Sequence, residues 1–507
     1  MNLKTVYPHL IIFFLALFLH FILNLKTPLH SDVTWYFRMQ VEDGRAISSY
    51  PSWMKDIGAY PDSIFANFGK WYQLTGRYNI LDFALFRSLA TIAGDNADLW
   101  RLFYVLLMAA SVGFFYLISK ELGITGKVRI LLVLSLLLWP LGPWTDYKTS
   151  EPKALLALMG AYFLTVRSKK MPINLVGAFL MLVAVLIKET FLVGYILIPF
   201  LIVWRHLRAS RKALLIDLSP HIFSLILLLG YFLAVRFVLG TVEGGYINLN
   251  QGLGENVFTY FLYNNINLLP VFANSWLKLI ILGSMTIFLV SISGIKIAKT
   301  IWYRIRSQLV IICGFSMTIF FYELIHFLTN RELFDRYLIP GNFLVAFLFG
   351  LLITPLFLRL APTWQKVFFG SILILMIPTI GILVKNRVQN RIDQQAWQSL
   401  ISQVKEAPVA AHVVLEFDDP FMIETAQSLE ANTIMAGRSD LTYHLNVGGY
   451  SDSVQREDFV NKLIELFNLE REPIISDTEI LYIKADRKGG DGTAYLNYRV
   501  IWQTLHE

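Results

Sequence analysis

Ionisable residues stand at the ends of long apolar runs throughout this chain of 507 residues. Charges at such positions are costly near hydrocarbon unless they face a protein cavity, so they are candidates for function. An acid, Asp32, follows the first apolar run closely. Cations enter or leave the later runs, and acids accompany them. The cations are Lys148, Lys153, Lys188, Arg236 and Arg336, and the accompanying acids are Asp146, Glu151 and Glu323.

This combination of charges suits one kind of chemistry. Cations gathered at one leaflet boundary match a lipid-linked phosphate, whose headgroup lies at that depth. A carboxylate at the same level can take a proton from an attacking hydroxyl. Glycosyl transfer from a polyprenyl phosphate needs both, because negative charge builds on the leaving phosphate. Nearby cations keep a carboxylate charged, which suits Asp32 as the base.

The elements that carry these residues are predicted to be membrane-spanning helices. The chain is 55% hydrophobic, with a mean hydropathy of +0.53. Runs of about 17–25 apolar residues recur, and that length crosses the hydrocarbon layer as a helix. We expect eleven spans, at roughly 8–25, 99–118, 128–142, 154–167, 172–187, 190–204, 219–240, 275–295, 308–328, 337–358 and 367–384.

The charges of the connecting loops predict the orientation. Alternate short loops are rich in Lys and Arg, which places them in the cytoplasm. The N-terminus is then cytoplasmic, and the long loop 26–98 and the tail are extracytoplasmic, as in a multi-pass protein of a bacterial inner or plasma membrane. The net charge of +7 comes largely from such loops and does not indicate nucleic-acid binding. The single cysteine, Cys313, excludes a disulfide within one chain and a multi-thiol metal site.

Two segments outside the spans have patterns of their own. Residues 78–94 have helical spacing of apolar positions with Asp82 and Arg87 off that stripe, which predicts a helix lying on the membrane plane. After residue 385 the pattern changes: "VAAHVVLEF" and "EILYIKA" predict strands, "REDFVNKLIELFNL" a helix, and "DRKGGDGTAYLNYRVIW" a turn or hairpin into a last strand. We therefore expect a transmembrane catalytic module over 1–385 and a small extracytoplasmic α/β domain over 386–507.

Four sequence elements resemble the GT-C membrane glycosyltransferases, which include protein O-mannosyltransferases and lipid A aminoarabinose transferases. They are the acid in "HSDVTWYF", the segments "KTSEPKALLALMGAYFL" and "LIKETFLVGYIL", and "DRYLIP". The resemblance implies that Asp32 is the catalytic base and that Lys148, Lys153, Lys188, Arg236 and Arg336 hold the donor phosphate. Many members carry a paired acid after the first span, whereas Asp32 stands alone, so Glu42 and Asp43 remain alternatives.

The resemblance also bears on cofactors and partners. It implies an inverting transferase that takes a sugar from a polyprenyl-phosphate donor, among membrane lipids, and needs no cofactor. Some members bind a divalent metal through loop acids, for which Asp32, Asp146 and Glu151 are the candidates, but we do not favour a metal here. The acceptor is open between a protein, a lipid and a growing cell-envelope glycan.

Two other functions are alternatives to glycosyl transfer from a polyprenyl phosphate. A polysaccharide polymerase or ligase with a lipid-diphosphate donor would need arginines in a large late loop, and the loop 241–274 has none. A flippase or transporter would need polar breaks near mid-membrane in paired halves, which the sequence does not show.

Overall fold

The computed structural model describes most of the predicted helical module and parts of the tail. The described residues are 11–12, 14–21, 68–69, 72, 76–93, 96–138, 150–168, 170–206, 211–240, 308–322, 324–325, 338–417, 429, 433, 438, 440–447, 480–488 and 495–503. They form two compact units. The first comprises Met1–Leu23, Phe68–Phe83 and Arg101–Val384, and the second Asn24–Asn67, Ala84–Trp100 and Lys385–Glu507.

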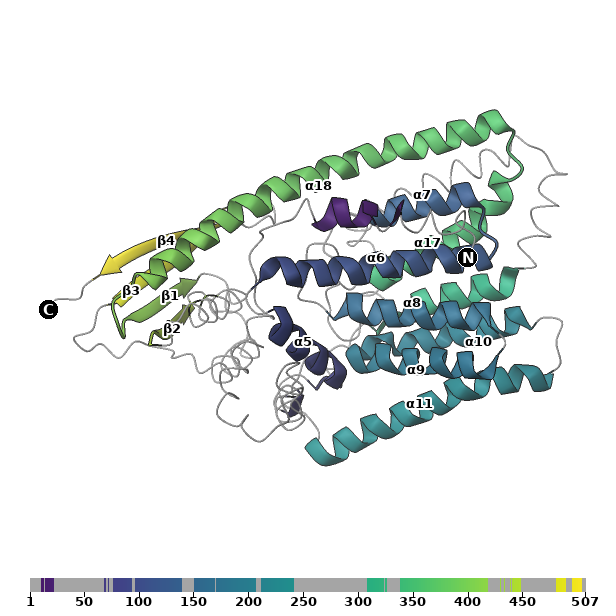
Figure 1. Ribbon diagram of the computed structural model, residues 1–507, viewed down its shortest axis with the longest axis horizontal. Coiled ribbons are helices and arrows are strands. Elements are labelled where there is room, and N and C mark those ends of the chain that lie inside the picture. Colours follow the sequence, from purple (N-terminus) through teal and green to yellow (C-terminus); the bar gives the residue numbers. More distant parts are fainter. Residues whose placement is uncertain are drawn as a thin grey trace, which may run out of the picture. The chain divides into compact units, whose positions relative to one another are not determined.

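Helices occupy most of the segments that the apolar runs predict (Figure 1). Within the described residues they are the π-helix η1 (Leu17–Phe21), α5 (Ile80–Ala93), α6 (Ala97–Glu121), α7 (Gly126–Leu137), α8 (Glu151–Arg167), α9 (Met171–Ile187), the 3-10 helix η4 (Glu189–Val193), α10 (Gly194–Arg205), α11 (Arg211–Leu239), the apolar helix Gln308–Tyr322, α17 (Leu338–Phe357) and α18 (Pro362–Lys405).

Three of the described helices are long and apolar enough to cross a membrane: Asp98–Glu121, Ala213–Leu239 and Ile339–Phe357. The predicted span 275–295 lies outside the described residues, and the total of eleven spans stays a prediction. α18 continues well past the predicted end of its span at residue 384 and through the predicted domain boundary. Its apolar first half and charged second half form one helix, which runs through Pro378 and Gly381 without ending there.

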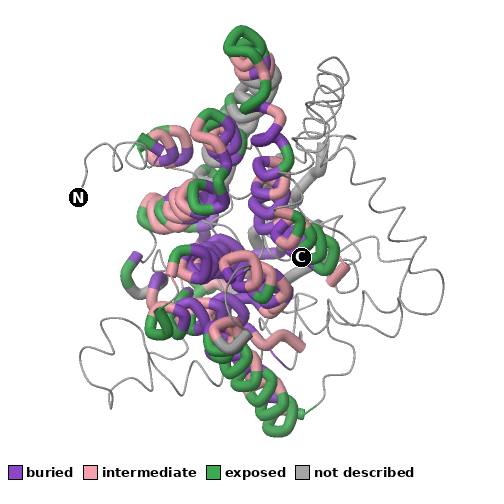
Figure 2. The backbone as a smooth tube through the Cα atoms, turned by 90° about the vertical axis from the view of Figure 1, so that its right-hand side faces the viewer, coloured by how far each residue is buried: buried purple, intermediate pink, exposed green. Residues whose placement is uncertain are grey.

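Helix α8 lies at the centre of the first unit. It packs against α9, α10 and α17, while α11 packs on the outer side of α9 and α10. In Figure 2, α11 is the mostly exposed helix at the bottom, and only 17% of its spanning window is buried, against 78% for α17. An apolar helix with so much exposed surface is suited to face lipid.

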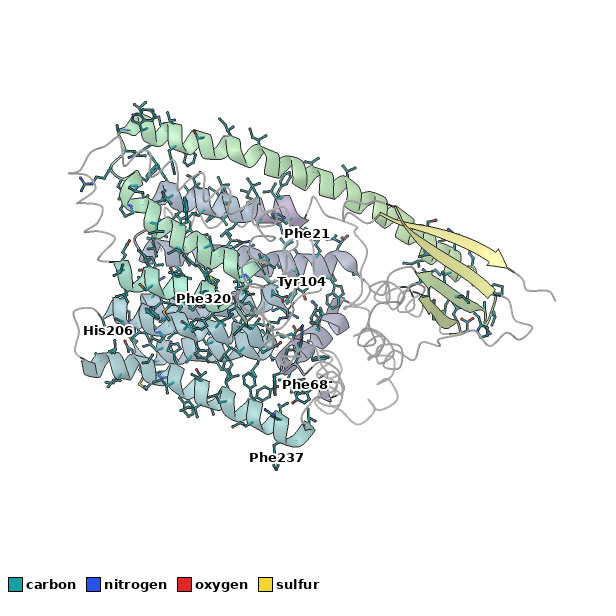
Figure 3. The ribbon with its side chains drawn as sticks, turned by 180° about the vertical axis from the view of Figure 1, so that it is seen from behind. Phe21, Phe68, Tyr104, His206, Phe237 and Phe320 are labelled. Carbon is teal, nitrogen blue, oxygen red and sulfur yellow. The ribbon has the colours of Figure 1, made fainter. Side chains whose placement is uncertain are left out.

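A buried polar network joins the helices at the end where α8 and α10 finish. Asp217, near the start of α11, accepts hydrogen bonds from Arg205, His206 and, at 2.9 Å, from Asn174 Nδ2. Arg205 also donates to the backbone carbonyl oxygens of Thr165 and Ser168 at the end of α8. Figure 3 labels His206 at the opposite end of the bundle from Phe68 and Tyr104.

Four strands of the second unit form one sheet in the order β2-β1-β3-β4. The strands are β1 (His412–Phe417), β2 (Thr442–Val447), β3 (Ile480–Lys488) and β4 (Tyr495–Gln503). β1 pairs in parallel with β2 and β3, and β3 pairs antiparallel with β4. β1 lies in a segment predicted as a strand, β3 continues from its predicted segment 479–485 to Lys488, and β4 follows the predicted turn. β2 was not predicted, and the predicted helix 456–469 lies outside the described residues.

Candidate functional site

The candidate site lies at the end of the bundle where α8 begins and α9 and α11 finish. The first segment to reach it is residues 76–82, which lead into α5. Asp82 stands in the first turn of α5, where the helix dipole favours an acid. It is buried, with 5% exposure, and forms an ion pair with Lys153 Nζ.

Helix α8 contributes two opposite charges in its first turn. Glu151 and Lys153 flank Pro152, which occupies a position where a helix tolerates proline because its missing N–H is not needed. Both charged side chains are buried, Glu151 at 1% and Lys153 at 5% exposure. Lys153 Nζ also lies 6.0 Å from the ring centroid of Tyr104 on α6.

The break between α9 and α10 supplies the third segment. α9 ends at Ile187, Lys188 has extended backbone (φ −149°, ψ 110°), and η4 begins at Glu189. This break sets two opposite charges side by side at the end of a helix that is otherwise apolar. Lys188 Nζ lies 3.1 Å from Glu151 Oε1, and Glu189 Oε1 lies 4.0 Å from Arg77 Nε.

These three ion pairs connect the three segments to one another in a closed cycle of alternating charge, which we call the charge ring. Its members, in order around the ring, are Arg77, Asp82, Lys153, Glu151, Lys188 and Glu189. Burial raises the pKa of the Asp82 carboxyl to about 6, against the opposing effect of Lys153 and Lys188, while Glu151 raises it further. Asp82 is therefore largely ionised at neutral pH but would accept a proton under mildly acidic conditions.

Arg236 lies beside this ring, in the last turn of α11, and its side chain is exposed. It acts electrostatically on Tyr72, whose hydroxyl donates to the Gly240 carbonyl oxygen at 3.0 Å. Burial raises the pKa of Tyr72 to about 12, so this phenol keeps its proton. Gly240 adopts φ +82°, the left-handed conformation that commonly ends a helix and favours glycine.

Aromatic contacts hold α11 against the segment that contains Arg77. The Tyr231 hydroxyl donates to the Tyr78 carbonyl oxygen at 3.0 Å, and the rings of Tyr78 and Phe232 lie 4.8 Å apart. The Tyr72 and Tyr78 rings meet edge to face at 5.3 Å. The same segment therefore contacts α11 through aromatic rings and α8 through an ion pair, which fixes its position.

Four of the predicted site residues fall in the described part of the chain: Lys153, Lys188, Arg236 and Glu151. The structure places all four at this end of the bundle, and it pairs Glu151 with Lys188. Asp32, Lys148, Arg336, Asp146 and Glu323 lie outside the described residues, as do Glu42 and Asp43. The predicted roles of all these residues remain predictions.

The sequence did not single out Asp82, Arg77 or Tyr72 for the site. The helical pattern of residues 78–94 puts Asp82 off the apolar stripe and so predicts an exposed side chain. The structure buries Asp82 instead, because Lys153 of α8 covers and neutralises its carboxylate. The sequence did carry one signal. Asp82 stands in the first turn of a helix beside apolar spans, where an acid needs a counter-charge, and the residue that supplies it is not close in the sequence. Its partner lies 71 positions later in the chain, beyond any helical spacing.

No group of three or more His, Cys, Asp or Glu residues with the geometry of a metal site occurs among the residues that the structure describes. Of the acids considered for a divalent metal, Glu151 alone is described, and it contacts the Lys188 ammonium.

Comparison with known proteins gives the fold. No protein-family model matches the chain, and no curated protein matches its sequence. A solved structure does match: ArnT from Cupriavidus metallidurans bound to undecaprenyl phosphate, at 12% identity and a TM-score of 0.51 over 95% of this chain and 93% of that one. This match agrees, at the level of the fold, with the resemblance that the sequence motifs indicate. The chain therefore has an ArnT-like fold, and three of its described helices are long and apolar enough to cross a membrane.

Proposed function

We propose that this protein is an inverting glycosyltransferase that moves a sugar from a polyprenyl-phosphate donor to a hydroxyl of an acceptor at the outer face of the membrane. The observation that carries the proposal is the position of Arg77 and Arg236, beside the buried ion pairs of Lys153 and Lys188, at one end of an apolar bundle. A headgroup phosphate at that end would meet positive charge while its polyprenyl tail stays among apolar helices. The ArnT-like fold supports the same reading, since the ArnT structure contains undecaprenyl phosphate.

The proposed reaction assigns one base and one leaving group. The acceptor oxygen bonds to the anomeric carbon, and the bond from that carbon to the phosphate oxygen breaks. The hydroxyl proton passes to the Asp32 carboxylate, and polyprenyl phosphate leaves with the bonding electron pair. Positive charge near the phosphate stabilises the negative charge that develops on it in the transition state.

The test uses the purified protein in lipid nanodiscs with a panel of polyprenyl-phosphate sugars and polyprenyl-diphosphate sugars. We expect release of polyprenyl phosphate from at least one monophosphate donor. Turnover confined to the diphosphate donors would favour a polymerase or ligase instead, and no turnover with any donor would contradict the proposal.

The base is tested by Asp32→Asn, which keeps the shape of the side chain and removes its basicity. Turnover should fall by roughly 10²–10⁴-fold, the usual contribution of a general base, while donor binding persists. Glu42→Gln and Asp43→Asn are the matched controls. If one of these abolished transfer and Asp32→Asn did not, the base would lie further along the loop.

A further inference from the structure

The charge ring joins three segments that are far apart in the chain. Each segment contributes one positive and one negative member: Arg77 and Asp82 before and within α5, Lys153 and Glu151 on α8, and Lys188 and Glu189 between α9 and α10. Each of the three ion pairs links two different segments. The arrangement therefore ties every segment to both of the others, and its formal charges sum to zero.

We infer that Lys153 and Lys188 are positioning residues, which hold the segment before α5 and the α9–α10 break against α8. The donor phosphate then contacts cations outside these two buried pairs. This inference rests on the proposed function. It divides the cations at this end of the bundle into two kinds: lysines that hold protein segments together and cations that contact the phosphate. It differs from the sequence-based expectation, in which both lysines touch the phosphate.

Burial is the first argument for the division. In the pair Lys153–Asp82 the side chains are 3% and 6% exposed, and in Lys188–Glu151 they are 5% and 1% exposed. A phosphate that drew either ammonium away would break a buried ion pair, which is strongly unfavourable. The carboxylates also cancel most of the attraction that the two lysines would exert on an anion.

Two other described cations of this end, Arg77 and Arg236, differ from these lysines in both burial and pairing. Arg77 and Glu189 are separated by 4.0 Å, the limit of an ion pair, and are 15% and 20% exposed. Arg236 is exposed, and no described acid forms an ion pair with it. Either guanidinium can meet an anionic headgroup without stranding a deeply buried carboxylate. A guanidinium also matches the oxygens of a phosphate with paired N–H donors.

The experiment separates the two roles by removing one or both members of a pair. The variants are Asp82→Asn, Lys153→Met and their double variant, with the matched set Glu151→Gln, Lys188→Met and their double variant. Each is measured for its thermal unfolding midpoint in detergent, its Kd for undecaprenyl phosphate and its turnover at saturating donor. Arg236→Gln is the reference for a cation that contacts the donor.

We expect each single variant to unfold at a lower temperature and each double variant to recover most of that loss, because replacing both partners of a buried pair is far less costly than removing one. The double variants should bind undecaprenyl phosphate within about threefold of the wild type and still turn over more slowly, since the segments are less firmly held. Arg236→Gln should weaken binding by about tenfold or more with little change in the midpoint.

Two results would overturn the inference. One is a double variant that binds undecaprenyl phosphate as weakly as Lys153→Met or Lys188→Met alone, which would make that lysine a phosphate ligand. The other is unfolding midpoints that simply add, which would mean that the pairs are not coupled. If the wild type bound no undecaprenyl phosphate, the proposed function would fail, while the coupling of the midpoints would still decide whether the pairs position the segments.

Discussion

Asp217 offers the clearest test of how the bundle is held together away from the candidate site. It is 4% exposed, and its carboxylate accepts hydrogen bonds from Arg205, His206 and Asn174. Asp217→Asn removes the negative charge and keeps the shape of the side chain. Arg205 then stays among the same neighbours without its counter-charge.

The magnitude follows from the burial of the pair. The side chains of Arg205 and Asp217 are both 5% exposed, so water cannot replace the lost partner. Removing one member of a buried ion pair costs about 3–5 kcal/mol, and we expect the free energy of unfolding to fall by that amount. Asn174→Ala removes only one hydrogen bond to the carboxylate, so it should cost less, about 1.5–3 kcal/mol.

The assay is reversible unfolding in mixed micelles, followed by circular dichroism as the denaturing detergent is increased. Ser219→Ala is the control, because Ser219 lies on the same helix and is exposed, and its substitution should stay within about 0.5 kcal/mol of the wild type. Donor affinity of the folded fraction should not change, since the network lies at the other end of the bundle.

The double variant Arg205→Met with Asp217→Asn should recover only part of the loss. Arg205 also donates to the carbonyl oxygens of Thr165 and Ser168, and these lose their partner in the double variant. A loss below about 1 kcal/mol for Asp217→Asn would refute the reasoning, because that is the range of solvent-exposed ion pairs.

Three further predictions concern other parts of the chain. Since burial raises the pKa of Asp82 to about 6, turnover should fall as the pH drops through that value, because the charge ring then loses a negative charge. An Asp82→Asn variant that kept the same acid limb would contradict this. Gly314→Ala should lower the unfolding midpoint, since the new Cβ would lie 2.6 Å from Phe200 Cβ, and an unchanged midpoint would show that the helices separate freely. In a cysteine-free background, Ser453→Cys should be labelled from outside intact cells and Ser210→Cys should not, and the reverse pattern would invert the predicted topology.

The positions of the helices could be predicted from the sequence because the cause is local. An unbroken apolar run must satisfy its own backbone hydrogen bonds in a membrane, so the predicted spans 154–167 and 172–187 coincide closely with α8 and α9. The short apolar runs of β1 and β3, rich in Val, Ile and Leu, likewise allowed these strands to be predicted. β2 was missed, because its place in the sheet comes from parallel pairing with β1, which is not adjacent in sequence.

The sequence also indicated that Glu151, Lys153, Lys188 and Arg236 lie at one end of the bundle, since each stands at the end of an apolar run. It did not indicate which charges meet. Lys153 could have faced lipid headgroups, solvent or a phosphate, and Asp82 appeared to lie on a polar face of its helix. The packing of segments 76–82, 151–153 and 188–189 decided that these charges are buried and paired. An ion pair depends on the distance and burial of two side chains, and when the partners come from separate helices, both quantities exist only in the tertiary structure.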